Sequence, residues 1–190
     1  MSRVWWIRHG PTHAKTMVGW TDLAADLSDH AALARLSDAL PDAPIISSDL
    51  DRAVMTANAI GGARARLEHQ IALREMHFGD WENRTFDDIE KTHGPLIRKF
   101  WEEPGDIAAP GGESWNDLSA RVSNAVDMLL SEAIQDLIVV AHMGVILTQV
   151  QRAYGWSAYE TLAQKIDNLS VTRLDLHDGD WAPILVNHLP

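Results

Sequence analysis

The spacing of apolar residues predicts a chain in which buried strands alternate with amphipathic helices. Short apolar runs rich in β-branched and aromatic residues, typical of buried strands, lie at 3–7, 44–47 and 137–141. Stretches with an apolar residue every three or four positions, typical of helices that cover a sheet, follow each of these runs. This alternation predicts a mostly parallel sheet with helices on both faces.

Local signals give the expected limits of the first two helices. Ser28 can cap a helix that ends before Pro41. The next helix is expected to start at Asp49 or Asp51 and to end at the glycine pair 61–62.

The middle of the chain combines helices with turn-rich segments. A short strand is expected at 66–71, before a segment at 73–85 whose charges lie among aromatic residues, as in loops beside a cleft. The helical spacing over 85–103 is broken by an internal Gly-Pro pair, and the most regular helical pattern covers 113–133. Between them, residues 104–112 form a Pro/Gly loop of the kind that borders sites or forms lids.

The end of the chain has a different pattern. Two strand-like runs at 170–177 and 181–188 flank Asp178-Gly179-Asp180, which is a hairpin signal. The predicted fold is therefore a three-layer α/β/α sandwich whose mainly parallel central sheet is closed by a terminal antiparallel hairpin. At 190 residues, a single domain over 1–190 is expected.

Composition narrows the function classes. With 27 acidic and 16 basic side chains the net charge is −11, so the overall field repels nucleic acids and anionic membranes. The absence of cysteine excludes disulfides, thiolate nucleophiles and sulfur-bound metals, and makes a cytoplasmic location the expectation. No apolar run approaches the ~18 residues of a membrane span. The expected partner is a small molecule, and a homodimer is favoured only by the general frequency of such assemblies.

Two of the predicted strands end in a histidine. His9 follows the first strand within Arg8-His9-Gly10, and His142 follows the strand at 137–141. Ligands of open α/β sheets bind beyond the carboxyl ends of the strands, so both imidazoles are expected to face one crevice. Arg52 is expected in the first turn of the helix after the second strand, where its guanidinium and the helix amides favour an anion.

These residues belong to a larger pattern that resembles the histidine phosphatase superfamily, the phosphoglycerate-mutase-like group named for its Arg-His-Gly motif. The resemblance covers nearly the whole chain, in the order that the family shows. Its matching stretches are residues 8–10, 47–53, Glu75 with 78–82, 110–114, 140–145 and 168–172. The combination of these stretches is specific, whereas no single one is.

The resemblance implies covalent phosphoryl transfer. His9 would attack phosphorus as a neutral imidazole and become a phosphohistidine. Glu75 would protonate the leaving oxygen and later accept a proton from the hydrolytic water. Fixed donors would surround the phosphoryl oxygens and stabilise the transition state. These donors would be Arg8, Arg52, His142 and Thr12. No metal and no cofactor is implied, because the protein's own cations take the place of magnesium.

Other glutamates compete for the proton-donor role, and one pair of histidines has a spacing that resembles a metal site. Glu82 and Glu113 compete with Glu75 for the acid role, and only the motif match favours Glu75. His13 lies four residues after His9, but the Gly-Pro pair between them breaks the helix that would bring both to one metal.

Departures from the family's pattern concern the pocket. Lys15 stands where the family commonly has asparagine, and its cation can replace that phosphate contact on a flexible stem. Met143 replaces a usual glycine, and Leu147 stands where many members carry a basic residue. Aromatic residues can also line a pocket for the leaving group, although plain packing is their more frequent role. These aromatic candidates are Trp81, Trp101 and Trp115.

The function predicted is metal-independent hydrolysis of a phosphomonoester of a small phosphorylated metabolite through a phosphohistidine on His9. A phosphoglycerate mutase, which returns the phosphoryl group to a second hydroxyl, is the nearest alternative. Mutases of the family are typically longer between the Glu75 region and the Pro-Gly-Gly region, where only 83–109 is available here. A binding protein that keeps the phosphate pocket without turnover is a third class, although it would not need both a nucleophile and a proton donor.

Overall fold

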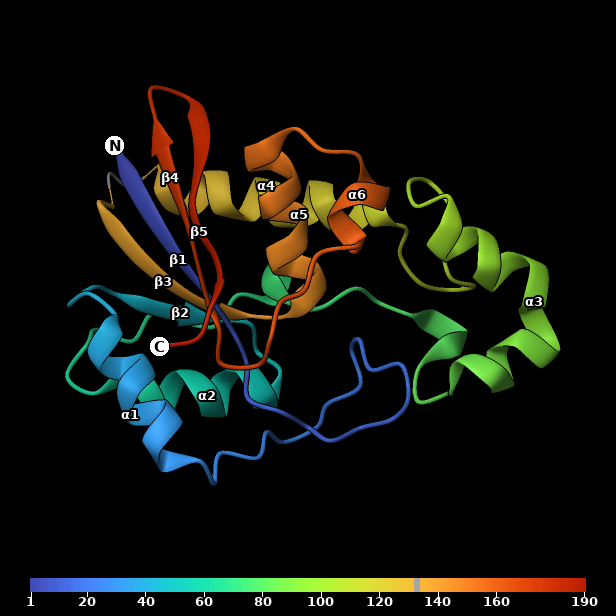
Figure 1. Ribbon diagram of the computed structural model, residues 1–190, viewed down its shortest axis with the longest axis horizontal. Coiled ribbons are helices and arrows are strands. Elements are labelled where there is room, and N and C mark those ends of the chain that lie inside the picture. Colours follow the sequence, from blue (N-terminus) through green and yellow to red (C-terminus); the bar gives the residue numbers. More distant parts are fainter. Residues whose placement is uncertain (132–133) are drawn as a thin grey trace.

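The central sheet explains how distant segments meet. A computed structural model describes residues 1–131 and 134–190, and its sheet has the strand order β2-β3-β1-β4-β5 (Figure 1). β1, β2 and β3 pair in parallel, β4 pairs antiparallel with β1, and β5 pairs antiparallel with β4. The strands are β1 (Ser2–Arg8), β2 (Ile45–Ser47), β3 (Asp136–Ala141), β4 (Val171–His177) and β5 (Asp180–His188). The predicted parallel sheet with a terminal antiparallel hairpin is confirmed.

Helices cover both faces of this sheet and give the predicted three layers (Figure 1). One face carries α1 (His30–Ala39) and α2 (Asp51–Gly61), and the other carries α4 (Trp115–Leu130) and α5 (Met143–Tyr154). The remaining helical elements are α3 (Phe86–Glu102), which extends away from the sheet, α6 (Ala158–Leu162), and the 3₁₀ helices η1 (Ile71–Leu73) and η2 (Gly79–Trp81). No helix in the described part of the chain is long and apolar enough to cross a membrane.

The side chains of β1 and β3 alternate between two hydrophobic cores. Val4 and Trp6 point into the core built with α4 and α5, whereas Ile7 belongs to the core built with α1 and α2. In β3, Val139 belongs to the core built with α4 and α5, and Ile138 belongs to the core built with α1 and α2. Successive strand residues face opposite sides, so a strand covered on both faces is apolar at every position. This is why the continuous apolar runs predicted buried strands correctly.

Two expectations about the first half of the chain are wrong. Asp29, and not Ser28, caps α1: its carboxylate accepts a hydrogen bond of 2.9 Å from the Ala32 amide. The amide of Ser28 instead donates to Asp26. Residues 66–71 form no strand, because Arg66 makes only an isolated bridge to the three-residue strand β2 and the chain then turns into η1.

Helices α3 and α4 largely follow the predicted pattern. α3 is kinked at His93, whose φ of −134° is non-helical, directly before the Gly-Pro pair. α4 begins at Trp115 because Ser114 and Asp117 form a capping box, so Glu113 lies outside the helix. The helix ends at Leu130, and the end of the predicted range, 132–133, lies outside the described residues.

Candidate functional site

The carboxyl ends of β1, β2 and β3 bring three side chains together. Arg8 is the register partner of Ala141, so His9 and His142 follow side by side, and their ring centroids are 5.1 Å apart. Ser48, which follows β2, places its Oγ 2.6 Å from Nε2 of His142. The two imidazoles therefore share one crevice, as the strand ends predict.

His9 is held as a neutral imidazole. Its Nδ1 lies 2.6 Å from the Gly10 carbonyl oxygen, which can only accept, so Nδ1 carries the hydrogen. Burial, followed by the charge of Arg52, lowers the pKa of His9 to about 3. The main chain is fixed on both sides, because Asn168 donates to the His9 carbonyl and the Gly10 amide donates to Thr56. Nε2 consequently bears the lone pair that a nucleophile requires.

His142 contributes an unpaired polar atom. The residue is fully buried, and among the described residues its Nδ1 has no hydrogen-bond partner. Nε of Arg8 is a second buried nitrogen without a partner in this part of the molecule. An unsatisfied buried polar group costs ~1–3 kcal/mol, so such atoms point to a place where a polar ligand or water binds.

The lowered pKa values of the two histidines predict acid sensitivity. Burial is the largest cause for both His9 and His142. In the unfolded chain a histidine takes up a proton near pH 6.5, so the folded state loses stability as the pH falls below that value. We expect His9 alone to remove ~2 kcal/mol from the free energy of unfolding between pH 7 and pH 5. Urea unfolding of wild type and His9→Asn at both pH values measures this, and equal losses in the two proteins would contradict it.

Two arginines bring positive charge to the crevice. Arg8 ends β1, and Arg52 lies in the first turn of α2, as expected. Arg52 is fully buried and donates to the carbonyls of Thr21 (2.9 Å) and Gly19 (2.6 Å). Burial lowers the pKa of both guanidinium groups, while the nearby Glu75 carboxylate favours their charged form. Each guanidinium has five N–H donors, so donors remain for an anion.

Glu75 reaches the same crevice from the loop after η1. Its carboxyl is buried, with Oε2 accepting from the Gly144 amide at 3.0 Å and Oε1 from the Met76 amide at 2.9 Å. Gly144 lies in the first turn of α5, two residues after His142. The start of α5 thus connects the carboxyl to the paired histidines.

The two competing carboxylates have other partners. Glu82 accepts hydrogen bonds from the amides of Gly19, Trp20 and Phe78, and so fixes the loop before α1. Glu113 uses both oxygens to bind Arg121, each at 2.7 Å. Of the three candidates, Glu75 is therefore the one best placed to exchange a proton with a ligand.

Gly144 is expected to be intolerant of any side chain. A Cβ at this position would overlap Oε1 of Glu75 and lie 3.2 Å from Cδ2 of Leu118. Because a displacement of about 1 Å can cost ~100-fold in rate, we expect Gly144→Ala to lower kcat/KM by about 10- to 100-fold in the phosphatase assay that the family resemblance suggests. Steady-state kinetics checks this. Gly61→Ala is the matched control, since a Cβ there meets nothing within 4 Å. Equal activity of the two variants would contradict the expectation.

The other predicted site residues take different positions. Thr12 is half-buried and Lys15 is exposed, both in the loop that follows His9. His13 binds Asp26 through Nε2 at 2.8 Å. Met143, the first residue of α5, lines a cavity beside Glu75.

The tryptophans separate into two roles. Trp81 is fully buried and packs edge-on against Phe100, with ring centroids 5.2 Å apart, so this predicted pocket residue belongs to the core instead. Trp101 and Trp115 line the cavity beside Glu75. Plain packing is the favoured expectation for these two residues, and the structure places them at a pocket instead. No signal in the sequence places Trp81 in the core and the other two at a cavity.

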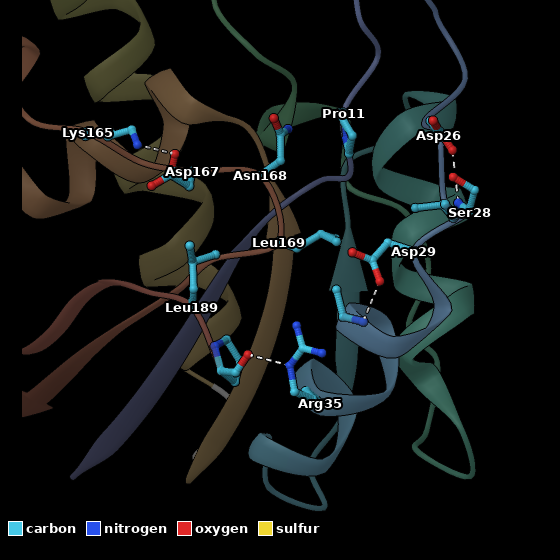
Figure 2. Close-up of a pocket in the computed structure, with 13 residues that line it drawn as sticks. Pro11, Asp26, Ser28, Asp29, Arg35, Lys165, Asp167, Asn168, Leu169 and Leu189 are labelled. Carbon is cyan, nitrogen blue, oxygen red and sulfur yellow. Dashed lines mark hydrogen bonds and ion pairs between the residues drawn. The ribbon is translucent and has the colours of Figure 1, made fainter.

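A larger cavity, of about 530 Å³, lies elsewhere, between the loop before α1 and the segment before β4 (Figure 2). Its charged groups are already engaged: Lys165 pairs with Asp167 at 2.7 Å, and Nε of Arg35 donates to the Pro190 carbonyl at 3.0 Å. Asp29 caps α1. We place the site at the histidine pair, because there buried nitrogens lack partners, whereas the larger cavity is lined by groups that satisfy one another.

Comparison with known proteins agrees with this geometry. A model of the histidine phosphatase superfamily (branch 1) matches residues 4–188. The chain belongs to this superfamily. It is 27% identical to the adenosylcobalamin/alpha-ribazole phosphatase of Escherichia coli, over 97% of this chain and 90% of that protein. It is 30% identical to phosphoglycerate mutase-like protein 4 of Arabidopsis thaliana, over 92% and 79%.

A solved structure gives the same family fold. YhfR of Bacillus stearothermophilus superposes with a TM-score of 0.91 at 25% identity and covers 100% of this chain and 98% of that one. The family resemblance and the three-layer fold expected from the sequence are both confirmed.

Sequence reasoning gave no role to three residues of this site. Ser48 binds His142, Asn168 binds the His9 carbonyl, and Arg121 binds Glu113. Ser48 had a usable signal, because it follows a buried strand in the same way as the two histidines. Arg121 lies within a regular helix, where a charged residue is ordinary.

Proposed function

We propose that this chain hydrolyses a phosphomonoester of a small metabolite, without a metal, by way of a phosphohistidine on His9. One observation carries the proposal: the buried, neutral His9 has an available Nε2 beside a second buried histidine and two guanidinium groups. The name of the alpha-ribazole phosphatase relative supports hydrolysis of a small phosphorylated substrate.

The first step transfers the phosphoryl group to the protein. Nε2 of His9 attacks phosphorus, the bond between phosphorus and the alcohol oxygen breaks, and the Glu75 carboxyl gives its proton to that oxygen. Negative charge on the phosphoryl oxygens is stabilised by fixed donors. Arg8, Arg52 and Nδ1 of His142 supply these donors, and Thr12 with Lys15 contribute from the following loop.

The second step returns the protein to its starting state. The Glu75 carboxylate accepts a proton from water, and the water oxygen attacks phosphorus. The bond between phosphorus and Nε2 breaks, inorganic phosphate leaves, and His9 is again a neutral imidazole. Two displacements of this kind need only one nucleophile and one proton carrier, which are the roles given to His9 and Glu75.

A phosphate-release panel tests this function. Wild type is incubated with several phosphomonoesters in EDTA, and inorganic phosphate is measured. Release that resists EDTA supports the metal-free hydrolase. Absence of release from every ester, with phosphorylation of His9 by a bisphosphoglycerate, would favour a mutase. Binding of phosphate with neither reaction would favour a binding protein.

A further inference from the structure

The cavity beside Glu75 is apolar and has the size of a small ring. Its volume is about 140 Å³, and its walls come from the helices and loops around the start of α5. The apolar side chains on these walls include those of Phe78, Trp101, Trp115, Met143, Leu147 and Leu162. An apolar cavity of ~150 Å³ accommodates benzene, so this space is sufficient for one ring or a short branched chain.

Charge is distributed unevenly around this cavity. Glu75 is the only ionisable residue among the described residues that line it. The one polar atom of the Trp115 ring, Nε1, is paired with Oε1 of Gln151 at 2.7 Å, so the ring offers hydrocarbon to the cavity. Leu147, a fully buried wall residue, adds no charge to the cavity. A leaving group that carries a second anion would therefore find a carboxylate and no cation here.

We propose that the cavity is the leaving-group subsite and that the natural substrate is a phosphomonoester whose alcohol carries an apolar group. This proposal rests on the proposed function, since it requires the phosphoryl group at His9 and the ester oxygen at Glu75. The alcohol then extends past the Glu75 carboxyl into the cavity. Burial of one ring is expected to raise kcat/KM by about 10- to 100-fold over that for an ester of a small polar alcohol.

Paired substrates test this subsite. Benzyl phosphate and 2-hydroxyethyl phosphate have alcohols of similar acidity, so the ratio of their kcat/KM values reports on the subsite and not on bond cleavage. We expect benzyl phosphate to be preferred, 3-phosphoglycerate to be poor, and Trp101→Ala to reduce the benzyl preference about tenfold, with Trp101→Phe retaining it. Equal kcat/KM for the two esters in wild type would overturn the subsite while leaving the hydrolase intact.

Binding measurements separate failure of the subsite from failure of the function. If no ester of the phosphate-release panel, these two included, is hydrolysed, the proposed function fails. Calorimetry with benzylphosphonate and methylphosphonate then decides the subsite, because these analogues need no turnover. At least tenfold tighter binding of benzylphosphonate supports the subsite, and equal binding overturns it.

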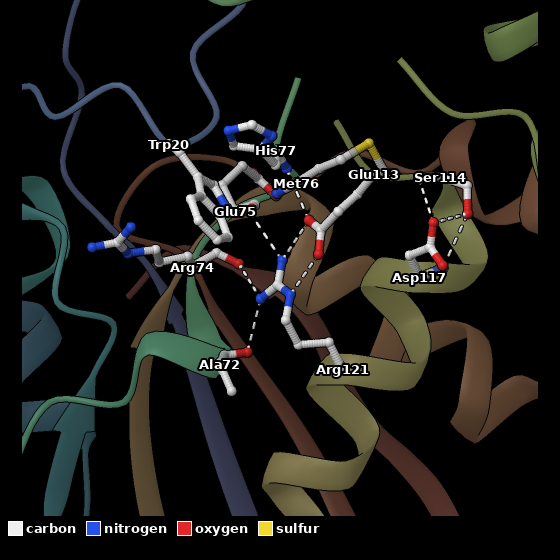
Figure 3. Close-up of polar contacts among 10 residues, drawn as sticks. All are labelled: Trp20, Ala72, Arg74, Glu75, Met76, His77, Glu113, Ser114, Asp117 and Arg121. Atoms are coloured by element: carbon white, nitrogen blue, oxygen red, sulfur yellow. Dashed lines mark hydrogen bonds and ion pairs between the residues drawn. The ribbon is translucent and has the colours of Figure 1, made fainter. Parts of the chain in front are cut away.

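Arg121 and Glu113 hold the loop that carries Glu75 (Figure 3). The Arg121 guanidinium, from α4, donates to the carbonyls of Ala72 (2.9 Å), Arg74 (3.0 Å) and Glu75 (3.2 Å). The same group binds both oxygens of Glu113, and Oε2 of Glu113 also accepts from the His77 amide at 2.9 Å. The main chain is thus held on both sides of Glu75.

We infer that Arg121, together with Glu113, is a positioning residue that aims the Glu75 carboxyl at the leaving oxygen. Nε1 of Trp20 adds a further hydrogen bond of 2.8 Å to the Glu75 carbonyl. Lysine cannot reproduce this role, because one ammonium group lacks the planar fork that binds several carbonyls and a carboxylate at once. Replacement of Arg121 should therefore loosen the loop at 72–77 and weaken proton transfer by Glu75 more than phosphate binding.

The dependence of kcat/KM on the acidity of the leaving alcohol tests this role. Esters of poor leaving groups need the acid, whereas 2,4-dinitrophenyl phosphate does not. We expect Arg121→Lys to lower kcat/KM for alkyl phosphates at least about tenfold more than for the dinitrophenyl ester. Arg64→Lys is the matched control, because Arg64 also binds several main-chain carbonyls, those of Ser37, Leu40, Pro41 and Ile60, away from the site.

The outcomes distinguish the positioning role from the acid role. A uniform loss for all esters in Arg121→Lys, with a leaving-group-dependent loss in Glu75→Gln, would overturn the positioning role alone. A uniform loss in Glu75→Gln would overturn the acid role in the proposed function. A leaving-group-dependent loss in Arg64→Lys equal to that in Arg121→Lys would show a general structural effect and would also overturn the positioning role.

Discussion

His9→Ala is expected to abolish release of phosphate from every phosphomonoester. Removal of a covalent nucleophile leaves only binding and electrostatic stabilisation, so kcat should fall by at least about 10³-fold. The loss should be the same for good and poor leaving groups, because both displacements pass through the His9 nitrogen. Steady-state phosphate release checks this over a panel of esters.

Two comparisons make this result specific. His30→Ala, an exposed residue at the start of α1, is the matched control and should retain wild-type turnover. Arg8 and Arg52 remain in His9→Ala, so the variant should still bind inorganic phosphate in calorimetry. More than a tenth of wild-type activity in His9→Ala would contradict the assignment of the nucleophile.

Glu75→Gln is expected to separate the two chemical steps. The amide keeps the shape of the side chain but cannot exchange the proton, so kcat/KM for alkyl phosphates should fall by about 10²- to 10⁴-fold. With 2,4-dinitrophenyl phosphate the first step needs no acid and should remain fast. The second step still needs the base, so the phosphohistidine should accumulate.

Stopped-flow absorbance measures this accumulation. We expect a burst of one dinitrophenolate per chain, followed by a slow steady rate. Glu82→Gln is not a neutral control, because Glu82 fixes the loop that contains Gly19 and Trp20, but its losses should be independent of the leaving group. A Glu75→Gln variant with no burst and a uniform loss over all esters would contradict the acid-base role.

The sequence predicted those parts of the molecule that depend on local patterns. Buried parallel strands are apolar on both faces, so β1 and β3 were recognisable from their continuous runs. The residues that follow such strands lie at one edge of the sheet, so the order of the elements is enough to place His9, His142 and Arg52 together. The hairpin between β4 and β5 followed from its Asp-Gly-Asp turn in the same way.

Other features depend on contacts between distant segments and had no local signal. The segment at 66–71 has apolar residues only at Leu67 and Ile71, and it lies beside β2, which is too short to pair along it. Trp81 lies in the segment expected to border a cleft and Trp101 in an expected helix, but the packing of α3 buries Trp81 and places Trp101 at a cavity. Glu113 resembles a catalytic candidate in the sequence, and only its pairing with Arg121 gives it another role.

The most direct test of the account is isolation of the phosphorylated protein. Wild type and Glu75→Gln are mixed with 2,4-dinitrophenyl phosphate, quenched in base within milliseconds, and mapped by peptide mass spectrometry. We predict one phosphoryl group per chain, on Nε2 of His9, at higher occupancy in Glu75→Gln than in wild type. Turnover with no phosphorylated peptide in either protein, or with the phosphoryl group on another residue, would contradict the proposed mechanism.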